Sequence, residues 1–401
     1  MEGGNAYLPR EIIVNILKRL PVKSLIRFQS VCKNWKNLLN DPLFIADHLH
    51  HSHHRPSFLF QQLYQRNNPL YLCSFDRNFR LREVHNPPVI DHYLSSFENF
   101  SNVRIIGSSN GLLCVELRDH YMSSHKLLVW NPAIKEEREV PRTTHCKSLV
   151  SIGFGFSTIA NDYKIINISF FGSYLDPKRG SYWAYKRGVN EVLVYSLGTG
   201  LWKRVEHGNT LKDLRIYCEA VTDNNGTIIW LAQNDDGDMI VSFDIAMEVF
   251  TLIPMPALHP GSTSIPTFYE DKPAFLSHKE TGNSKSGFIH LWVVEENTLC
   301  ASGGGRWIWT KKYSSGPNLY PDYLVPLNIW RNEIICTAGL HRQFYWKTEK
   351  YSEALKDRGR TLYLLNLTTS EIKNFFMNNF ICGSGILNYV ESLVPVGNIH
   401  I

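Results

Sequence analysis

The sequence contains no long hydrophobic run and no secretory leader pattern. No segment approaches the run of about 18 uninterrupted apolar residues that a membrane-spanning helix needs. Near the start of the chain, Asn15, Lys18 and Arg19 interrupt the early apolar stretch, and no basic region precedes it. These absences exclude a transmembrane span and argue against a secretory signal, so we expect no membrane partner.

The cysteines show no pairing motif. The chain has eight of them without any Cys-x-x-Cys spacing, at positions 32, 73, 114, 146, 218, 300, 336 and 382. Isolated cysteines are typical of reduced, buried thiols in intracellular proteins rather than of a disulfide framework. We therefore expect the protein in the cytoplasm, the nucleus or both.

A strong excess of one charge is also missing. The formal net charge is +5 over 401 residues. An excess this small does not by itself indicate binding to nucleic acid, so we expect no nucleic-acid partner.

Signatures of catalysis are absent as well. There is no Gly-x-Ser-x-Gly, no His-Glu-x-x-His and no phosphate-binding loop. The stretch NDDGDM (234–239) lacks the downstream Glu of a calcium loop. The histidines between His48 and His54 are too closely spaced for the ligand frame of a structural zinc site. The sequence thus predicts no catalytic residue, no metal site and no cofactor.

Helical periodicity is confined to the first fifty residues. Ile13, Ile16, Leu17 and Leu20 recur with the spacing of one helix face. Pro21 should end that helix, and a second helix is predicted from about Ser24 to Asp41-Pro42, with its own apolar stripe. Helices this short cannot cover both stripes by themselves. The stripes could pack on the rest of the chain or on a partner protein.

The segment LPREIIVNILKRLPVKSLIRFQSVCKNWKNLLNDPLF (8–44) resembles an F-box, in the form common among land plants. In that family the apolar face docks on the adaptor Skp1, which links to cullin 1 and a RING subunit of a ubiquitin ligase. The resemblance favours partner docking for the stripes. It implies a Skp1-binding set of Leu8, Pro9, Ile13, Ile16, Leu17, Leu20, Pro21, Val22, Leu25, Phe28, Val31, Cys32 and Trp35.

Beyond residue 56 the pattern changes to short strands separated by turns. A strand–turn–strand template recurs in 126–141, 191–206, 238–254 and 361–375, with a stretched copy in 287–313. Repeated strand pairs predict a β-propeller of six or seven blades, and a two-sheet β-sandwich array is the alternative. Pairing of 389–396 with 57–63 would close the ring.

These repeats resemble the F-box-associated, distantly kelch-like domain of plant F-box proteins. The fold class predicted is α+β multidomain, with a short helical F-box before a mostly β, propeller-like domain. The predicted boundaries are 1–48 for the F-box, 49–56 for a linker, 57–396 for the propeller-like domain and 397–401 for a tail.

Aromatic and basic residues gather in segments that depart from the template. Aromatic side chains and Arg dominate binding hot spots, although packing within a blade also explains single tryptophans. The predicted target-binding residues are Trp183, Tyr185, Arg187, Trp307, Tyr345 and Trp346.

The resemblance implies that the protein is the substrate-recognition subunit of a Skp1–cullin–F-box (SCF) ubiquitin ligase, which binds an unknown target protein for ubiquitination and proteasomal degradation. The mechanism expected is positional, and the chain itself is expected to be non-catalytic. The alternatives are an enzyme working in a propeller channel and a Skp1-binding protein that acts without cullin.

Overall fold

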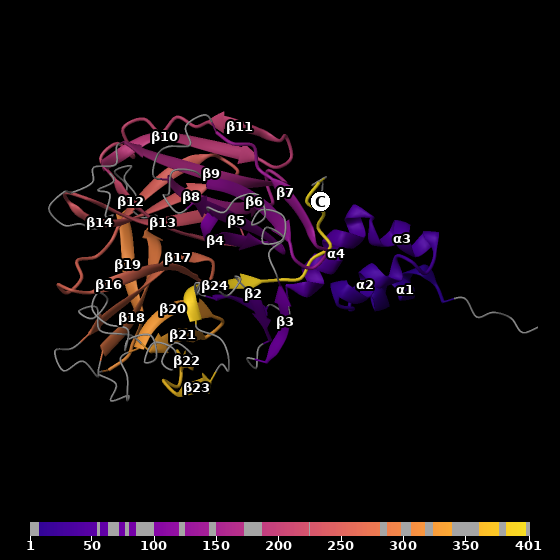
Figure 1. Cartoon of the computed structure of the whole chain (residues 1–401). Helices are drawn as coiled ribbons and strands as arrows, with labels where there is room; N and C mark the ends of the chain where they lie inside the picture. Colours follow the sequence, from indigo (N-terminus) through magenta and orange to yellow (C-terminus); the bar gives the residue numbers. More distant parts are fainter. Residues whose placement is uncertain are drawn as a thin grey trace, which may run out of the picture.

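The protein folds into a helical module beside a ring of β-sheets (Figure 1). The computed structural model describes residues 8–53, 57–62, 72–76, 80–85, 100–119, 125–143, 150–171, 187–223, 225–280, 287–297, 306–316, 324–338, 361–376 and 382–397. Across these ranges, none of the helices has the length and apolar character needed to cross a bilayer.

The ring consists of six blades, each a four-stranded antiparallel sheet. From the innermost strand outward, the blades are β24-β1-β2-β3, β4-β5-β6-β7, β8-β9-β10-β11, β12-β13-β14-β15, β16-β17-β18-β19 and β20-β21-β22-β23. This architecture confirms the predicted helical module followed by a propeller, fixes the blade number at six, and excludes the β-sandwich alternative.

The strands have the following bounds. Blades 1 and 2 contain β24 (Cys382–Tyr389), β1 (Ser57–Gln62), β2 (Leu72–Phe75), β3 (Leu81–His85), β4 (Phe100–Ser109), β5 (Leu112–Asp119), β6 (His125–Asn131) and β7 (Glu136–Glu139). Blades 3 and 4 contain β8 (Val150–Ser157), β9 (Asp162–Phe171), β10 (Arg187–Ser196), β11 (Leu201–Arg204), β12 (Arg215–Thr222), β13 (Thr227–Asn234), β14 (Gly237–Asp244) and β15 (Val249–Pro254). Blades 5 and 6 contain β16 (Thr263–Tyr269), β17 (Lys272–Glu280), β18 (Gly287–Asn297), β19 (Arg306–Ser314), β20 (Leu324–Trp330), β21 (Glu333–Ala338), β22 (Thr361–Asn366) and β23 (Ile372–Phe376).

The recurring sequence template corresponds to the outer hairpin of a blade. Its five copies coincide with β6–β7, β10–β11, β14–β15, β18–β19 and β22–β23. The outer strands alternate between exposed and covered positions, as in β15, where Val249 and Thr251 are exposed and Phe250 and Leu252 are partly covered. That alternation gives the outer pair a clearer local pattern than the inner strands, which are covered on both sides.

The ring closes through the pairing of β24 with β1, in which Tyr389 faces Ser57. The expected closure between the two ends of the chain is therefore present, but the predicted strand 389–396 is wrong. The closing strand is 382–389, and the residues after it leave the sheet. The Asn131 side chain holds them by donating hydrogen bonds to the carbonyl oxygens of Ser392 and Val394, at 3.0 and 2.8 Å.

All six inner strands run in the same direction, so the propeller has two distinct faces. We call the face where the inner strands end the helix face, because β24 ends there and β1 begins there directly after the helices. In blades 2 to 6 the end of the first strand and the start of the second lie on the helix face. In every blade the end of the third strand and the start of the fourth also lie on that face. The opposite face, which we call the far face, holds the ends of the strands that join one blade to the next.

The helical module contains four helices: α1 (Arg10–Leu17), α2 (Val22–Phe28), α3 (Lys33–Leu39) and α4 (Pro42–Ser52). The prediction of one second helix from Ser24 is wrong. The structure has two helices there: α2 begins at Val22, and α3 begins at Lys33 after Cys32, which is extended with φ −159°. Asp41 and Pro42 end one helix and also begin the next, since the Asp41 carboxylate accepts from the Leu43 N–H at 3.0 Å.

The α4 helix continues to Ser52, inside the range predicted as a linker. His48 on this helix is buried, and its Nε2 lies 3.0 Å from the Leu20 carbonyl oxygen. Burial lowers the pKa of His48, an effect that the Leu20 carbonyl opposes and His51 reinforces. His48, one of the clustered histidines, therefore belongs to the interior of the helical module and links α4 to the residues that follow α1.

Three of the cysteines are buried free thiols within the blades, namely Cys73, Cys114 and Cys336. Burial raises the pKa of Cys73 to about 12 and raises the pKa values of the other two further. These thiols stay protonated at neutral pH and pack as small apolar groups.

Candidate functional site on the helical module

Part of the predicted apolar stripe forms the core of the module itself. Leu17, Val22, Leu25 and Leu39 are each at most 1% exposed. Phe28 and Trp35 pack against them, with ring centroids 5.3 Å apart. The short helices can cover these side chains because α4 and the propeller add to the same hydrophobic cluster.

A second apolar set remains on the surface of the module. Its members are large aliphatic side chains with 37–81% of their surface exposed: Leu8, Ile12, Ile16, Ile26, Val31 and Leu43. We call this group the exposed apolar set. Large aliphatic side chains of this number in a module of some forty residues are typical of a surface that another protein covers.

The structure divides the predicted Skp1-binding residues between these two environments. Exposed positions are Leu8, Pro9, Ile16, Pro21, Val31 and Cys32; partly covered ones are Ile13, Leu20, Phe28 and Trp35. Leu17, Val22 and Leu25 are buried, so in this arrangement they support the helices and do not face a partner.

Sequence reasoning missed three members of the exposed apolar set, Ile12, Ile26 and Leu43. A helix stripe read by spacing alone does not say which side faces the core. Ile12 and Ile16 are four residues apart and point outward, whereas Leu17 and Leu20 belong to the packed side. The signal that could have identified these exposed residues is the width of the apolar pattern, which is wider than one buried helix face requires.

The module is seated on blades 1 and 2 at the helix face. Lys23 on α2 pairs with Glu83 on β3 at 3.4 Å. The Val22 N–H donates to the carboxylate of Glu391, which lies just after β24. A residue near the C-terminal end of the sequence therefore caps the N-terminus of α2. Burial nevertheless raises the pKa of Glu391, an effect that Arg82 opposes.

The chain after β24 lies too close to blade 2 for any side chain at Gly111. A Cβ at Gly111 would meet the Cβ of Ser392 at 2.5 Å, and its φ of 84° also favours glycine. This close approach fixes residues 390–392 between the helices and the ring.

The propeller channel contains a cavity of about 780 Å³, lined by residues from all six inner strands. Asp223 is one of its acidic residues, and burial raises its pKa, with Asp271 adding to the rise. Its Oδ1 already accepts hydrogen bonds from the N–H groups of Asn225 and Thr227, at 2.9 and 2.6 Å, so it stabilises the β12–β13 turn. Among the described residues, no group of three or more acidic, His or Cys side chains is arranged to hold a metal ion.

Comparison with known families accounts for both parts of the chain. An F-box domain matches residues 7–46, and an F-box associated beta propeller domain matches residues 58–301. The chain belongs to the plant F-box proteins with an F-box associated β-propeller. An F-box joined to a propeller indicates a substrate-recognition protein of SCF type with a Skp1-type partner, and membership of this adaptor family indicates a non-catalytic role.

The relatives of this F-box protein include several from Arabidopsis thaliana. One F-box protein is 28% identical over 269 residues, which cover 64% of this chain and 63% of that relative. The F-box protein CPR1 is 26% identical over 330 residues, covering 77% of this chain and 73% of the relative. Among solved structures, an oligogalacturonate lyase from Vibrio parahaemolyticus aligns with a TM-score of 0.43 and 10% identity over 80% of this chain and 75% of that chain. A likeness at that level supports no statement about activity.

Most of the predicted target-binding residues lie outside the described residues: Trp183, Tyr185, Tyr345 and Trp346. Arg187 is the first residue of β10. Trp307 on β19 is half-buried against a cluster from blades 4 and 5 that contains Phe275. The strand ends that flank residues 172–186 and 339–360 lie on the far face.

Proposed function

We propose that this F-box protein is the substrate-recognition subunit of an SCF ubiquitin ligase. Its helical module binds a Skp1-type adaptor, and through it cullin 1 and a RING subunit. Its propeller binds a target protein, which is ubiquitinated and then degraded by the proteasome. The chain carries no catalysis and works in the cytoplasm, the nucleus or both. The observation that carries the proposal is the exposed apolar set on helices whose own core is already filled.

The energetics of docking favour this assignment. Covering a fully exposed large aliphatic side chain contributes about 1.5–3 kcal/mol, and the exposed apolar set offers six that are partly exposed. Several such contacts offset the loss of translational freedom on association. Once both partners are bound, the ligase acts by raising the effective concentration of target lysines near the charged ubiquitin.

The test is co-expression with a plant Skp1-type adaptor. We expect wild type to co-purify with the adaptor in a one-to-one complex, and the double variant Ile16→Asp/Val31→Asp to lose it. Both side chains are about half exposed or more, at 48% and 62%, so the new carboxylates stay in water and the fold is kept. The matched control is Ile159→Asp in the β8–β9 turn, where the side chain is 82% exposed, and it should bind as wild type does.

Two results would contradict the proposal. If wild type purified alone and ignored the adaptor, the exposed apolar set would not be an adaptor interface. If the adaptor bound but no cullin joined the complex after both were supplied, the protein would act as a Skp1-binding protein outside a ligase.

A further inference from the structure

Blade 5 holds a second cavity, of about 830 Å³, on the far face of the propeller. Its walls come from the end of β17, the start of β18, the end of β19 and the connection that leads from β15 into β16. These positions are the strand ends opposite the helix face. The volume is within the usual range for sites that take a ligand or the side chains of a peptide.

Basic side chains dominate the polar part of this cavity. They are His259, His278, His290, Lys279 and Lys311. None of the described residues that line the cavity is acidic. Lys279 has no ion pair within the described ranges, and the Lys311 Nζ lies over the Trp292 ring, 4.7 Å from its centre.

Three of these groups lie close enough to act on one another. Burial lowers the pKa of His290, and the neighbouring Lys311 and His259 lower it further. Crowding of like charges without a counter-charge is relieved when an anion binds between them. The His290 Nδ1 is 2.9 Å from the Ser314 Oγ, which orients the ring and leaves its Nε2 without a hydrogen-bond partner in the described structure.

The rest of the wall is apolar and fixed in place. Trp292 stacks on Phe275 with centroids 6.1 Å apart and planes within 11°. Phe288 stacks on His290 with centroids 6.2 Å apart. Leu258 from the β15–β16 connection adds an aliphatic surface. The cavity therefore places a positive cluster beside an aromatic and aliphatic wall.

We propose that this cavity binds an acidic peptide segment of a protein partner, with an apolar side chain against Phe288 and Leu258 and a carboxylate between Lys279, Lys311 and His290. The assignment to a target rests on the function proposed above. Charge complementarity selects the acidic partner. The position on the far face leaves the segment free to bind while the helices hold the adaptor.

The test uses the full chain, purified with its adaptor or alone, and an array of short peptides in which one Phe or Leu stands beside two Glu residues. Matched arrays carry Gln or Lys in place of Glu. We expect the Glu array to contain binders, the other arrays to bind at least about tenfold more weakly, and Lys279→Glu and Lys311→Glu each to reduce binding by a similar factor. Lys212→Glu, an exposed lysine in the connection between β11 and β12, is the matched control and should bind as wild type does.

Several outcomes would overturn the proposal. If the Gln array bound as tightly as the Glu array, or if Lys212→Glu lost as much binding as Lys279→Glu and Lys311→Glu, the basic cluster would not be what binds the peptide. Tighter binding of free 3-phenylpropionate than of any peptide would assign the cavity to a small carboxylate instead. All variants should keep adaptor binding, so failure here and failure of the ligase proposal give different results.

Discussion

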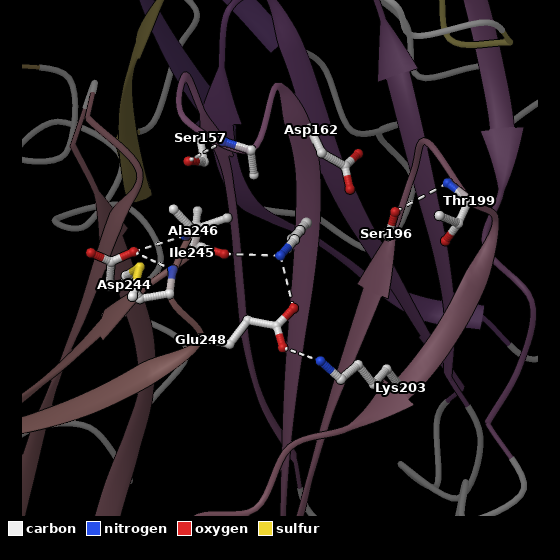
Figure 2. Close-up of polar contacts among 12 residues, drawn as sticks. Ser157, Asp162, Ser196, Thr199, Lys203, Asp244, Ile245, Ala246 and Glu248 are labelled. Atoms are coloured by element: carbon white, nitrogen blue, oxygen red, sulfur yellow. Dashed lines mark hydrogen bonds and ion pairs between the residues drawn. The ribbon is translucent and has the colours of Figure 1, made fainter.

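Glu248 joins two neighbouring blades through two lysines (Figure 2). It lies in the β14–β15 turn of blade 4 and pairs with Lys164 on β9 and Lys203 on β11, each at 2.8 Å. Lys164 also donates to the Ile245 carbonyl at 3.0 Å. Burial alone would raise the pKa of Glu248, but the hydrogen bonds from both lysines outweigh it and hold the pKa below its usual value.

Replacing Glu248 by Gln should destabilise the protein by about 1–3 kcal/mol, because Lys164 is largely buried and would lose its counter-charge. Chemical unfolding at neutral pH measures the difference. A carboxylate whose pKa is lowered by folding stabilises above its unfolded pKa and loses this effect as the pH falls through its folded pKa. The gap between wild type and Glu248→Gln should therefore close at acidic pH.

The control for this prediction is Glu206→Gln, whose side chain is 89% exposed and which should change stability by less than about 0.5 kcal/mol. A Glu248→Gln gap that stayed constant down to acidic pH would show that the carboxylate charge is not the source of the stabilisation.

At the scale of elements, one turn recurs in four outer hairpins. Asn131, Ser196, Asp244 and Asn366 end the third strand of their blades, and each side chain accepts a hydrogen bond from an N–H in the turn that follows. Four residues later the backbone has positive φ, at Lys135, Gly200, Glu248 and Ser370. This shared chemistry explains why a local template could find these hairpins.

Closure of the ring should be required for a stable propeller. A chain ending at residue 381 lacks β24, so β1 would keep its pairing with β2 but would become the unpaired inner edge of blade 1. We expect this truncation to be insoluble or rapidly cleaved in limited proteolysis. Removal of residues 398–401 alone is the control and should leave protease resistance unchanged. A soluble, resistant protein without β24 would contradict the closure role.

The sequence could therefore predict blades where the information is local. It predicted five outer hairpins from their turns and the ring closure in outline. It could not select 382–389 as the closing strand, because CGSGILNY carries two glycines and resembles a turn, whereas YVESLVPV is richer in apolar residues. That choice depends on contacts with β1, more than three hundred residues away.

The helical module was also predicted only in part. Spacing located its apolar positions, but the division between core and exposed sets depends on α4 and on contacts with the propeller. Leu17 and Ile16 are adjacent in sequence, yet one is 1% and the other 48% exposed. The far-face cavity gave no local signal, since its basic residues come from four separate segments.

At the scale of the whole molecule, the helices and the propeller share one hydrophobic cluster, which includes Leu49 of α4 and Val394 after β24. We therefore expect them to unfold together. Circular dichroism at the helix wavelength and tryptophan fluorescence should give coincident thermal transitions. Glu391→Ala removes the carboxylate at the start of α2 and should bring the helical transition to lower temperature. Two separate transitions in wild type would show that the module is an independent unit.

The common direction of the inner strands also determines which segments of such a protein can vary in sequence without affecting its frame. Every junction between blades begins and ends on the far face, so altering a connection such as residues 255–262 disturbs no pairing between strands. The frame and the helices would stay as they are while the recognition surface varied. The ring thus allows specificity to be exchanged segment by segment, as loops are exchanged on an antibody domain.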